Sequence, residues 1–556
     1  MPAKHLVIGL DGFDVDIIEG ATEHLPQICR RMNEGAWARQ RSVMPPATLP
    51  NWTTFLTGVD PGRHGVFDFT TRQGTRVSFT GGTVREAPTL AARLDRMGKR
   101  CALIGFPATY PPEPLEHGIF MSGWDAPVAF EDDASFVWPP SLHAQITRRF
   151  GKTQFDDVNE FDADRPGWHD ALPAALVRRV QRKVRLCEWL LERESWDLFA
   201  VYFGESDTAG HHLWAHHDPT SPRRPAGLPL ETPSGLVQVY AALDSATGAL
   251  CRASGEDVEL TVVSDHGSGG SSDRVLYLNR VLADAGLLSF RVPSPAERVR
   301  AIATSALKDA ALRVLSPALR ERIFRFGAID LPGLLESQAR FGAIDFSKTR
   351  AFSDELNYFP GVWINDAREA QGIVHDCEAA RMETRAALLA LRDPWDDEPV
   401  VTRVYKREEL FDGPHVERAP DLLLELRLPE GYSYNMMPSA SAPAGTGPFR
   451  RLDASEMLGR KGRSLAGSHR ARGFFLASGP SVAATGEIDC AIADAAATLL
   501  ARMGVAVPAD ASGRVLYEIL EAMVDTSPLP AGAPPARVQS TSASVERRLR
   551  ALGYID

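Results

Sequence analysis

The sequence has few cysteines, and no two of them lie close together. The six, spread singly over 556 residues, are Cys29, Cys101, Cys187, Cys251, Cys377 and Cys490. Zinc ribbons and redox pairs need cysteines a few residues apart, so the spacing excludes both. We therefore predict reduced thiols within a hydrophobic core.

Long apolar runs and an excess of basic residues are also missing. No run approaches the roughly 20 apolar residues of a membrane-spanning helix. The opening MPAKHLVIGLDGF shows no cleavage site, so we expect no signal peptide and a cytoplasmic location. The net charge of -11 gives no general attraction to nucleic-acid polymers or anionic lipid. Any anionic substrate must therefore be held by a local positive site, and bound metal is one way to build it.

Short runs rich in Val, Ile, Leu and Phe are present, and they predict buried strands. They are HLVIGLDGF near residue 5, ALIGFP near 102, DLFAVYFGESD near 197, ELTVVSDHG near 259 and DLLLEL near 421. Helix-like segments such as ALVRRVQRKVRLCEWLLERE separate some of them. The sum predicts an α/β fold, a mostly parallel central sheet with helices on both faces.

The chain is longer than one hydrophobic core usually allows, so we expect a large catalytic domain carrying an insertion. We place the domain at residues 1–525, with a helical insertion at about 285–345 that caps the site. From residue 526 a Pro/Ala/Ser linker leads into a short C-terminal helix ending at 556. Its stripe of Val545, Leu549 and Leu552 docks on the chain's own surface, or else contacts a partner or a membrane.

Metal-ligating side chains follow three of the predicted strands, and a fourth segment adds one more. They are Asp11, then Asp207 and His211, then Asp265 and His266, and finally His469 in a glycine-flanked loop before another strand. A single Asp or His of this kind is often a helix cap or a core residue. In open α/β sheets, however, ligands bind at the carboxyl ends of the strands. Carboxylates and imidazoles from four segments therefore predict a site for zinc or a neighbouring first-row metal.

A candidate nucleophile lies in MPPATLPNWTTFLTG. A helix over 49–57, with Pro50 in its first turn, puts the Thr48 hydroxyl at a helix N-terminus. Free backbone N–H groups there stabilise an alkoxide and a phosphoryl oxygen. The same geometry suits a plain helix cap, and only the metal ligands favour catalysis.

These motifs, in this order, resemble the alkaline phosphatase superfamily and its type I phosphodiesterase/nucleotide pyrophosphatase branch, from Asp11 to about Pro480. The resemblance implies that Thr48 is the nucleophile and forms a covalent phosphothreonine. It also implies two divalent metals, zinc with manganese or iron as alternatives. One would be held by Asp207, His211 and His469, and the other by Asp11, Thr48, Asp265 and His266.

Two departures from the branch concern nucleotide specificity. Nucleotide pyrophosphatases carry an Asn shortly after the His-Gly that follows the nucleophile helix, whereas this chain has Asp68 and Phe69. His469 is followed by Arg470 where those enzymes tend to have Gly. Asn51, Arg470 and Lys461 are the candidate substrate-binding residues.

Formal charges favour a diester as substrate. Two dications, three carboxylates and the Thr48 alkoxide sum to zero, which suits a monoanionic small-molecule phosphodiester better than a monoester dianion. A phosphomonoesterase or a phosphonate hydrolase of the same superfamily is the enzymatic alternative. Mutases and sulfatases are disfavoured, because they use serine or a modified residue. The non-enzymatic alternative is a metal-stabilised binding protein.

Overall fold

The computed structural model describes most of the chain. It covers residues 3–527 apart from 124–133, 154–157, 159, 161–162, 164, 230–232, 256, 292–336, 339, 356–358, 444, 461–463 and 523–525. Within these ranges no helix has the length and apolar character needed to cross a membrane. Most of the expected insertion, Lys461, and the linker and C-terminal helix after residue 527 lie outside the described residues.

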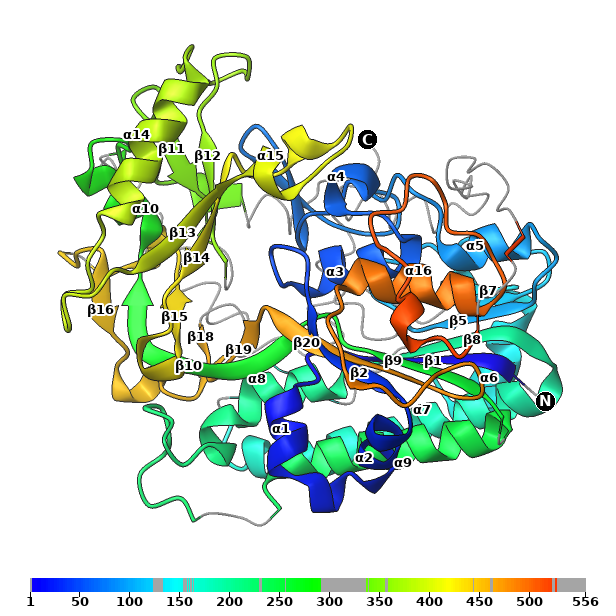
Figure 1. The fold of residues 1–556 in the computed structure, drawn as a ribbon. Helices are drawn as coiled ribbons and strands as arrows, with labels where there is room; N and C mark the ends of the chain where they lie inside the picture. The colour runs from blue at the N-terminus through cyan, green and yellow to red at the C-terminus, as the bar shows by residue number, and fades with distance from the viewer. Residues whose placement is uncertain are drawn as a thin grey trace.

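A nine-stranded sheet forms the centre of the molecule (Figure 1). In spatial order its strands are β21 (Gly486–Glu487), β2 (Ala36–Arg41), β20 (Arg472–Ser478), β9 (Glu259–Val263), β1 (Ala3–Leu10), β8 (Trp196–Phe203), β5 (Cys101–Ile104), β6 (Ile119–Met121) and β7 (Val137–Trp138). The run from β9 to β6 is parallel, and β20 and β7 are antiparallel to their inner neighbours. The prediction of a mostly parallel sheet is confirmed.

Helices cover both faces of this sheet (Figure 1). One face carries α1 (Val15–Gly20), α2 (Pro26–Glu34), α7 (Trp168–Arg193), α8 (Glu205–His217) and α9 (Gly235–Ser254). The other carries α3 (Thr48–Thr57), α4 (Pro61–His64), α5 (Leu90–Asp95) and α16 (Ile492–Arg502), while α6 (Ser141–Phe150) packs beside β7 and α7. Sheet strands covered on both sides are apolar throughout, which is why β1 buries all but one of its residues.

Two helices near the site show how the sequence sets their ends. α3 begins at Thr48, has Pro50 in its first turn, and stops at Gly58, whose φ of 76° suits glycine. α9 begins after Ser234, whose hydroxyl accepts a hydrogen bond from the Val237 N–H. Every residue of α3 is buried, so this helix is held firmly against its surroundings.

A second group of strands stands beside the central sheet (Figure 1). Four strands form an antiparallel sheet, in the order β11 (Ala351–Ser353), β12 (Gly361–Ile364), β14 (Leu422–Leu426) and β13 (Val401–Lys406), with α10 (Leu278–Asp284), α14 (Cys377–Leu389) and the short α15 (Arg407–Leu410) packed nearby. The long strand β10 (Gly267–Leu276) runs from the central sheet into this region and pairs with β15 (Ser433–Met436), β16 (Phe449–Arg451) and β19 (Gly467–Arg470). Two small hairpins, β3 (Thr70–Gln73) with β4 (Arg76–Phe79) and β17 (Gly459–Arg460) with β18 (Ser464–Leu465), complete the strands.

The segment DLLLEL corrects one expectation. It forms β14 of the antiparallel sheet instead of a strand of the parallel one. The expected burial is nevertheless present in Leu422, Leu423 and Leu424, because side chains cover both faces of this sheet too. An apolar run therefore predicts a covered strand but not which sheet contains it.

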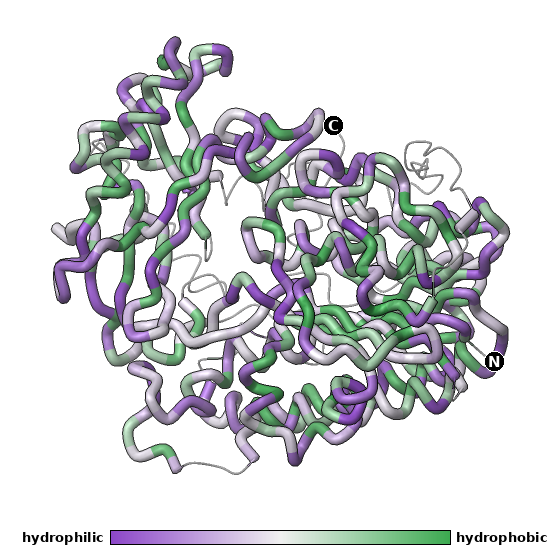
Figure 2. Tube along the Cα trace, in the orientation of Figure 1, coloured by the Kyte–Doolittle hydropathy of each residue, from purple (hydrophilic) through white to green (hydrophobic). Residues whose placement is uncertain are grey.

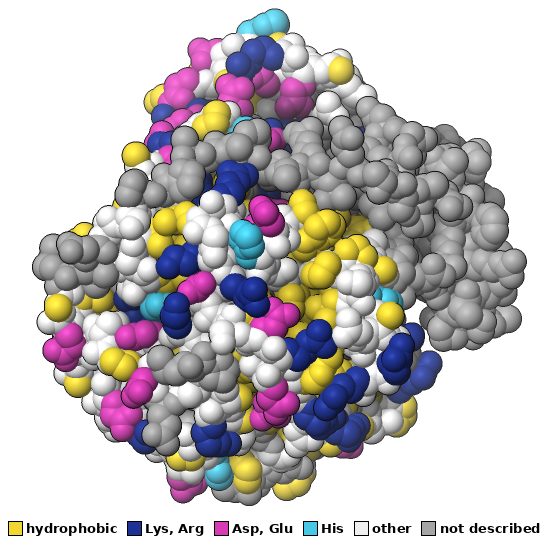
Figure 3. All heavy atoms as spheres, turned by 90° about the vertical axis from the view of Figure 1, so that its right-hand side faces the viewer, with side chains coloured by type: hydrophobic (Ala, Val, Ile, Leu, Met, Phe, Trp, Pro, Cys, Tyr) yellow, Lys and Arg dark blue, Asp and Glu magenta, His cyan; other side chains and the backbone are white. Residues whose placement is uncertain are grey.

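Each sheet has its own hydrophobic core. The larger cluster surrounds the nine-stranded sheet, and the smaller one lies among β11 to β14, α10 and α14. Figure 2 shows the hydrophobic residues concentrated along the central strands. On the face drawn in Figure 3, both basic and acidic side chains occur among the described residues, so the charge there is mixed.

Candidate functional site

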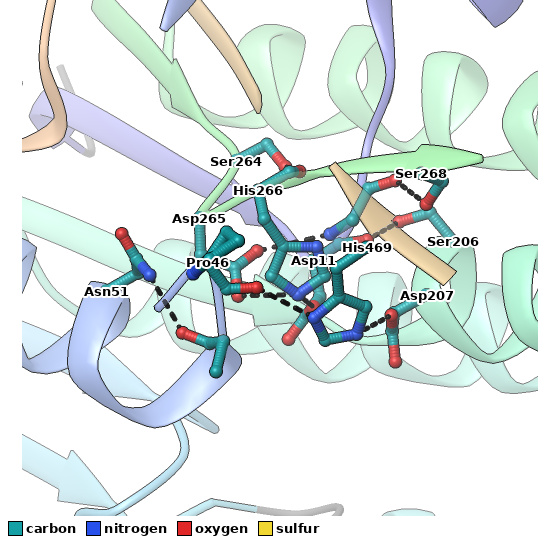
Figure 4. A network of polar contacts seen from close by, with 12 residues as sticks. Asp11, Pro46, Asn51, Ser206, Asp207, Ser264, Asp265, His266, Ser268 and His469 are labelled. Carbon is teal, nitrogen blue, oxygen red and sulfur yellow. Dashed lines mark hydrogen bonds and ion pairs between the residues drawn. The ribbon is translucent and has the colours of Figure 1, made fainter. Parts of the chain in front are cut away.

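The strand register brings the predicted ligands to one edge of the central sheet. Leu10 pairs with Phe203, and Gly9 pairs with Val263, so the carboxyl ends of β1, β8 and β9 lie side by side. Asp11 follows β1, Asp207 lies in the first turn of α8 after β8, and Asp265 follows β9. Parallel pairing therefore gathers residues that are about 200 positions apart in the sequence (Figure 4).

His469 reaches the same place from the other direction, and its setting corrects the expected loop. It lies in the short strand β19, where it pairs with Ser268 of β10. Gly467 lets this strand approach α8 closely, since a side chain there would meet the Gly210 carbonyl at 2.0 Å. The close approach places His469 beside His211.

Asp207, His211 and His469 form the first group of ligand atoms. His211 Nε2 lies 3.0 Å from His469 Nε2, and Asp207 Oδ1 lies 3.3 Å from the former and 3.5 Å from the latter. Zinc bonds of about 2.0–2.1 Å in a tetrahedron place neighbouring ligand atoms roughly 3.3 Å apart. The three atoms thus have the spacing of a metal-coordinating face.

Asp11, Asp265 and His266 form the second group. His266 Nε2 lies 3.3 Å from Asp11 Oδ1 and 3.2 Å from Asp265 Oδ2. All three side chains are at most 1% exposed, and none of these three atoms has a hydrogen-bond partner. Buried polar atoms are nearly always satisfied, so three such atoms facing one another fit a bound cation.

The two groups adjoin each other. The rings of His266 and His469 stack with centroids 3.6 Å apart, and His266 also lies within ligand range of Asp207 and His469. We keep His266 with Asp11 and Asp265, because its Nε2 is closest to their carboxylates. The structure therefore brings together all six predicted metal-ligating side chains other than that of Thr48.

Backbone carbonyls orient the three imidazoles. The Nδ1 of His211 lies 3.1 Å from the Gly467 oxygen, that of His266 lies 3.0 Å from the Gly267 oxygen, and that of His469 lies 2.8 Å from the Pro46 oxygen. A carbonyl oxygen only accepts, so each Nδ1 carries the proton. Each Nε2 then turns its lone pair to the cluster, as metal-binding histidines do.

Burial puts the carboxylates under electrostatic strain. Burial and the nearby Asp207 raise the pKa of Asp11 to about 8. Burial and Asp11 likewise raise the pKa of Asp265 well above its usual value. Burial also acts to raise the pKa of Asp207, but the charge and hydrogen bond of His211 outweigh it and hold this pKa well below the ordinary value. Cations beside these groups would relieve their mutual repulsion.

Thr48 is the first residue of α3 and is 7% exposed. The loop before it is tied to the metal-ligand cluster, because the Pro46 carbonyl accepts from His469 Nδ1. Asn51 braces the same loop. Its amide nitrogen donates to the Pro45 and Ala47 carbonyls, and its oxygen accepts from the Val43 N–H. Asn51 therefore braces the loop before the candidate nucleophile, and its contact with substrate stays a prediction.

Arg470 points into the protein. Its guanidinium donates to the Ser433 hydroxyl and to the carbonyls of His469, Gly270 and Gly431. These bonds connect β19 to its neighbours, which gives Arg470 a structural role, and its contact with substrate stays a prediction. Asp68 accepts from the backbone N–H of Phe69 and offers no amide donor.

Two residues that sequence reasoning missed contact Asp11. The Tyr202 hydroxyl donates to Asp11 Oδ2 at 2.5 Å, and the Trp52 indole N–H donates to the same oxygen at 3.2 Å. Tyr202 lies in an apolar run, and Trp52 lies in a helix segment of mixed apolar and threonine residues, so both resemble ordinary core residues. The one available signal is the spacing of Trp52, which lies four residues after Thr48 and so shares its helix face.

Two solved structures are similar to this chain at low sequence identity. The human ectonucleotide pyrophosphatase/phosphodiesterase 5 is 16% identical with a TM-score of 0.47, and 93% of this chain and 100% of that one are covered. The phosphonoacetate hydrolase of Sinorhizobium meliloti 1021, solved with phosphonoformate, is 15% identical with a TM-score of 0.49 over 89% and 94% of the two chains. No curated protein matches the sequence.

A family model gives the decisive match. The model described as type I phosphodiesterase / nucleotide pyrophosphatase matches residues 5–441. That range contains β1, α3, β8 and β9, and every predicted site residue except Lys461, His469 and Arg470. The match spans well over half of the sequence, and the chain belongs to the type I phosphodiesterase/nucleotide pyrophosphatase family of metal-dependent phosphoric ester hydrolases.

Proposed function

We propose that the chain is a phosphodiesterase that uses Thr48 as its nucleophile and binds two divalent cations, zinc by preference. The observation that carries the proposal is the pair of adjoining ligand groups, one of which has three buried atoms without hydrogen-bond partners. Asp207, His211 and His469 would hold one cation. Asp11, Asp265 and His266 would hold the other, with Thr48 beside it.

The chain's own residues would hold the nucleophile in place. Asn51 fixes the loop before α3, and the Pro46 carbonyl joins that loop to His469. Thr48 begins α3, so its oxygen and a phosphoryl oxygen would both lie near free backbone N–H groups. Bound divalent cations would lower the pKa of the Thr48 hydroxyl and offset charge on the phosphoryl group.

The reaction would take two displacements. The Thr48 oxygen attacks phosphorus as the bond to the leaving-group oxygen breaks, which yields a phosphothreonine ester and a free alcohol. Water then attacks the same phosphorus, the bond to Thr48 breaks, and a phosphate monoester leaves. Substrate enters from the side of Asp207 and His211, whose side chains are 22% and 12% exposed, whereas Asp11 and Asp265 are closed off from solvent.

A diester substrate is favoured by charge. The two cations, three carboxylates and the Thr48 alkoxide sum to zero, so a monoanion meets no net repulsion. A monoester dianion would need an additional cation, and the donors of Arg470 are bonded to Ser433 and backbone carbonyls.

The zinc-loaded protein should hydrolyse bis(p-nitrophenyl) phosphate faster than p-nitrophenyl phosphate. We expect kcat/KM for the diester to exceed that for the monoester by at least about 10-fold, which is roughly 1.4 kcal/mol of transition-state stabilisation. Release of p-nitrophenol under matched conditions measures both. A preference for the monoester overturns the diesterase assignment, and turnover of a phosphonate ester alone would reassign the enzyme as a phosphonate hydrolase.

Zinc should stabilise the folded chain, because the ligand groups exist only in the native state. With free zinc at 100 times the Kd of a site we expect a gain of about 2.7 kcal/mol from each bound ion, measured as a rise in Tm over chelator-treated protein. Asp265→Asn should lose the gain from the ion at Asp11, Asp265 and His266 and keep the gain from the other. Asp197→Asn is the matched control, since Asp197 lies on β8 at the opposite end from the site and bonds to Lys4. If zinc, manganese and iron all leave Tm unchanged, the two candidate ligand groups bind no cation.

A further inference from the structure

The carboxylate of Asp11 uses its two oxygens differently. Oδ1 faces His266 Nε2 at 3.3 Å and has no hydrogen-bond partner. Oδ2 accepts from both the Tyr202 hydroxyl at 2.5 Å and the Trp52 indole at 3.2 Å. The carboxyl group cannot rotate without breaking both hydrogen bonds, and a bound cation that keeps it ionised would strengthen them. Its single open oxygen is thus held towards the ligand cluster.

The two donors come from rigid and different elements. Tyr202 lies on β8, where it pairs with Gly9 of β1, two residues before Asp11. Trp52 lies on α3 and is completely buried. Its ring meets Tyr202 and Phe106 edge-on, with centroids 5.5 and 5.3 Å away. Aromatic packing of this kind fixes the direction of the indole N–H.

Gly9 makes room for this arrangement. A side chain at Gly9 would place its Cβ 2.8 Å from the Trp52 ring and 3.0 Å from the Phe106 ring. The indole therefore lies directly against the backbone of β1. This contact lets an N–H from α3 reach Asp11, which follows the end of the same strand.

Trp52 also shares a helix face with the nucleophile. Thr48 and Trp52 are four residues apart in α3, and residues at this spacing lie one above the other on a helix. The bond from Trp52 to Asp11 therefore connects the helix that carries the nucleophile to a ligand of the neighbouring cation site. Tyr202 makes no such connection, because it lies on the sheet.

We propose that Trp52 and Tyr202 are positioning residues that hold Asp11 as a one-oxygen metal ligand, and that Trp52 in addition sets the place of Thr48 relative to that ligand. The inference rests on the proposed function, since it needs a cation at Asp11. Removing a residue that hydrogen-bonds to a metal ligand commonly weakens metal binding by about 10–100-fold.

Tyr202→Phe and Trp52→Phe test the proposal by removing one donor each while keeping a buried ring. We expect each variant to bind zinc at the Asp11 site about 10–100-fold more weakly, measured by competition with a chelator. Two variants serve as matched controls. Tyr434→Phe removes a hydroxyl that bonds to the buried Asp393, away from the site. Trp196→Phe removes the indole of the first residue of β8, which bonds to the Leu190 carbonyl. Both controls should bind zinc as the parent chain does.

Saturating zinc separates the two roles. Tyr202→Phe should regain the parent kcat once zinc fills the site, whereas Trp52→Phe should keep a reduced kcat because Thr48 remains displaced. Affinities for zinc within about threefold of the parent in both variants overturn the positioning role. Full recovery of kcat by Trp52→Phe overturns the coupling to Thr48. A parent chain that binds no metal refutes the proposed function itself, so the two failures are distinct.

Discussion

Thr48→Ala should reduce hydrolysis of a phosphodiester by at least about 10³-fold. Removal of a nucleophile deletes the covalent route and leaves only the contribution of binding and charge stabilisation. The two ligand groups do not depend on the methyl or hydroxyl of Thr48, so the variant should still bind zinc. Steady-state kinetics and metal analysis of the same sample measure the two effects. Mass spectrometry of acid-quenched parent protein should locate a phosphoryl adduct on Thr48.

Thr53→Ala is the matched control for that experiment. Thr53 lies on the same helix and is equally buried, and its hydroxyl donates to the Leu49 carbonyl at 2.6 Å. Its loss should cost about 0.5–1.5 kcal/mol of stability and leave kcat within about threefold. Activity of Thr48→Ala within tenfold of the parent would remove Thr48 from the mechanism. A parent chain that binds zinc and hydrolyses no phosphate or phosphonate ester would instead support the metal-stabilised binding protein.

The candidate metal ligands could be predicted because each belongs to a local pattern. Asp11 directly follows an apolar run, Asp265 follows another after Ser264, and Asp207 lies four residues after a third. Parallel pairing then places the carboxyl ends of neighbouring strands together. The meeting of the ends of β1, β8 and β9 could therefore be predicted without knowing how the side chains pack.

Contacts that depend on packing could not be predicted in this way. Tyr202 and Trp52 contact Asp11 across 191 and 41 residues of sequence, and beyond the helical spacing of Trp52 from Thr48 nothing in their segments marks them as polar partners. The short strand that contains His469 depends on the approach of Gly467 to α8. Asn51 and Arg470 belong to the right segments, but their donors are taken by backbone oxygens.

Lys183 shows the same limit most clearly. It lies in the charged, helix-like run 178–193, where a lysine is normally a solvent-exposed side chain. The structure buries it completely on α7, with its ammonium 2.8 Å from Glu205 Oε1, which is also buried completely. Glu205 begins α8, two residues before Asp207. A buried ion pair therefore holds the start of α8, the helix that carries the candidate metal ligands Asp207 and His211.

Lys183→Met should destabilise the fold by about 3–5 kcal/mol, because it leaves the Glu205 carboxylate buried without its cation. Chemical denaturation and Tm measure the loss, and zinc affinity should fall with it since α8 carries Asp207 and His211. The double variant Lys183→Met with Glu205→Gln should recover much of the stability, because no charge remains to be buried.

The exposed ion pair of Arg100 and Glu194 serves as the control for the buried pair, and Arg100→Ala should cost at most about 1 kcal/mol of stability. Equal costs for Lys183→Met and Arg100→Ala would mean that water reaches the Glu205 carboxylate, and the burial of the pair would then contribute nothing to holding α8 in place.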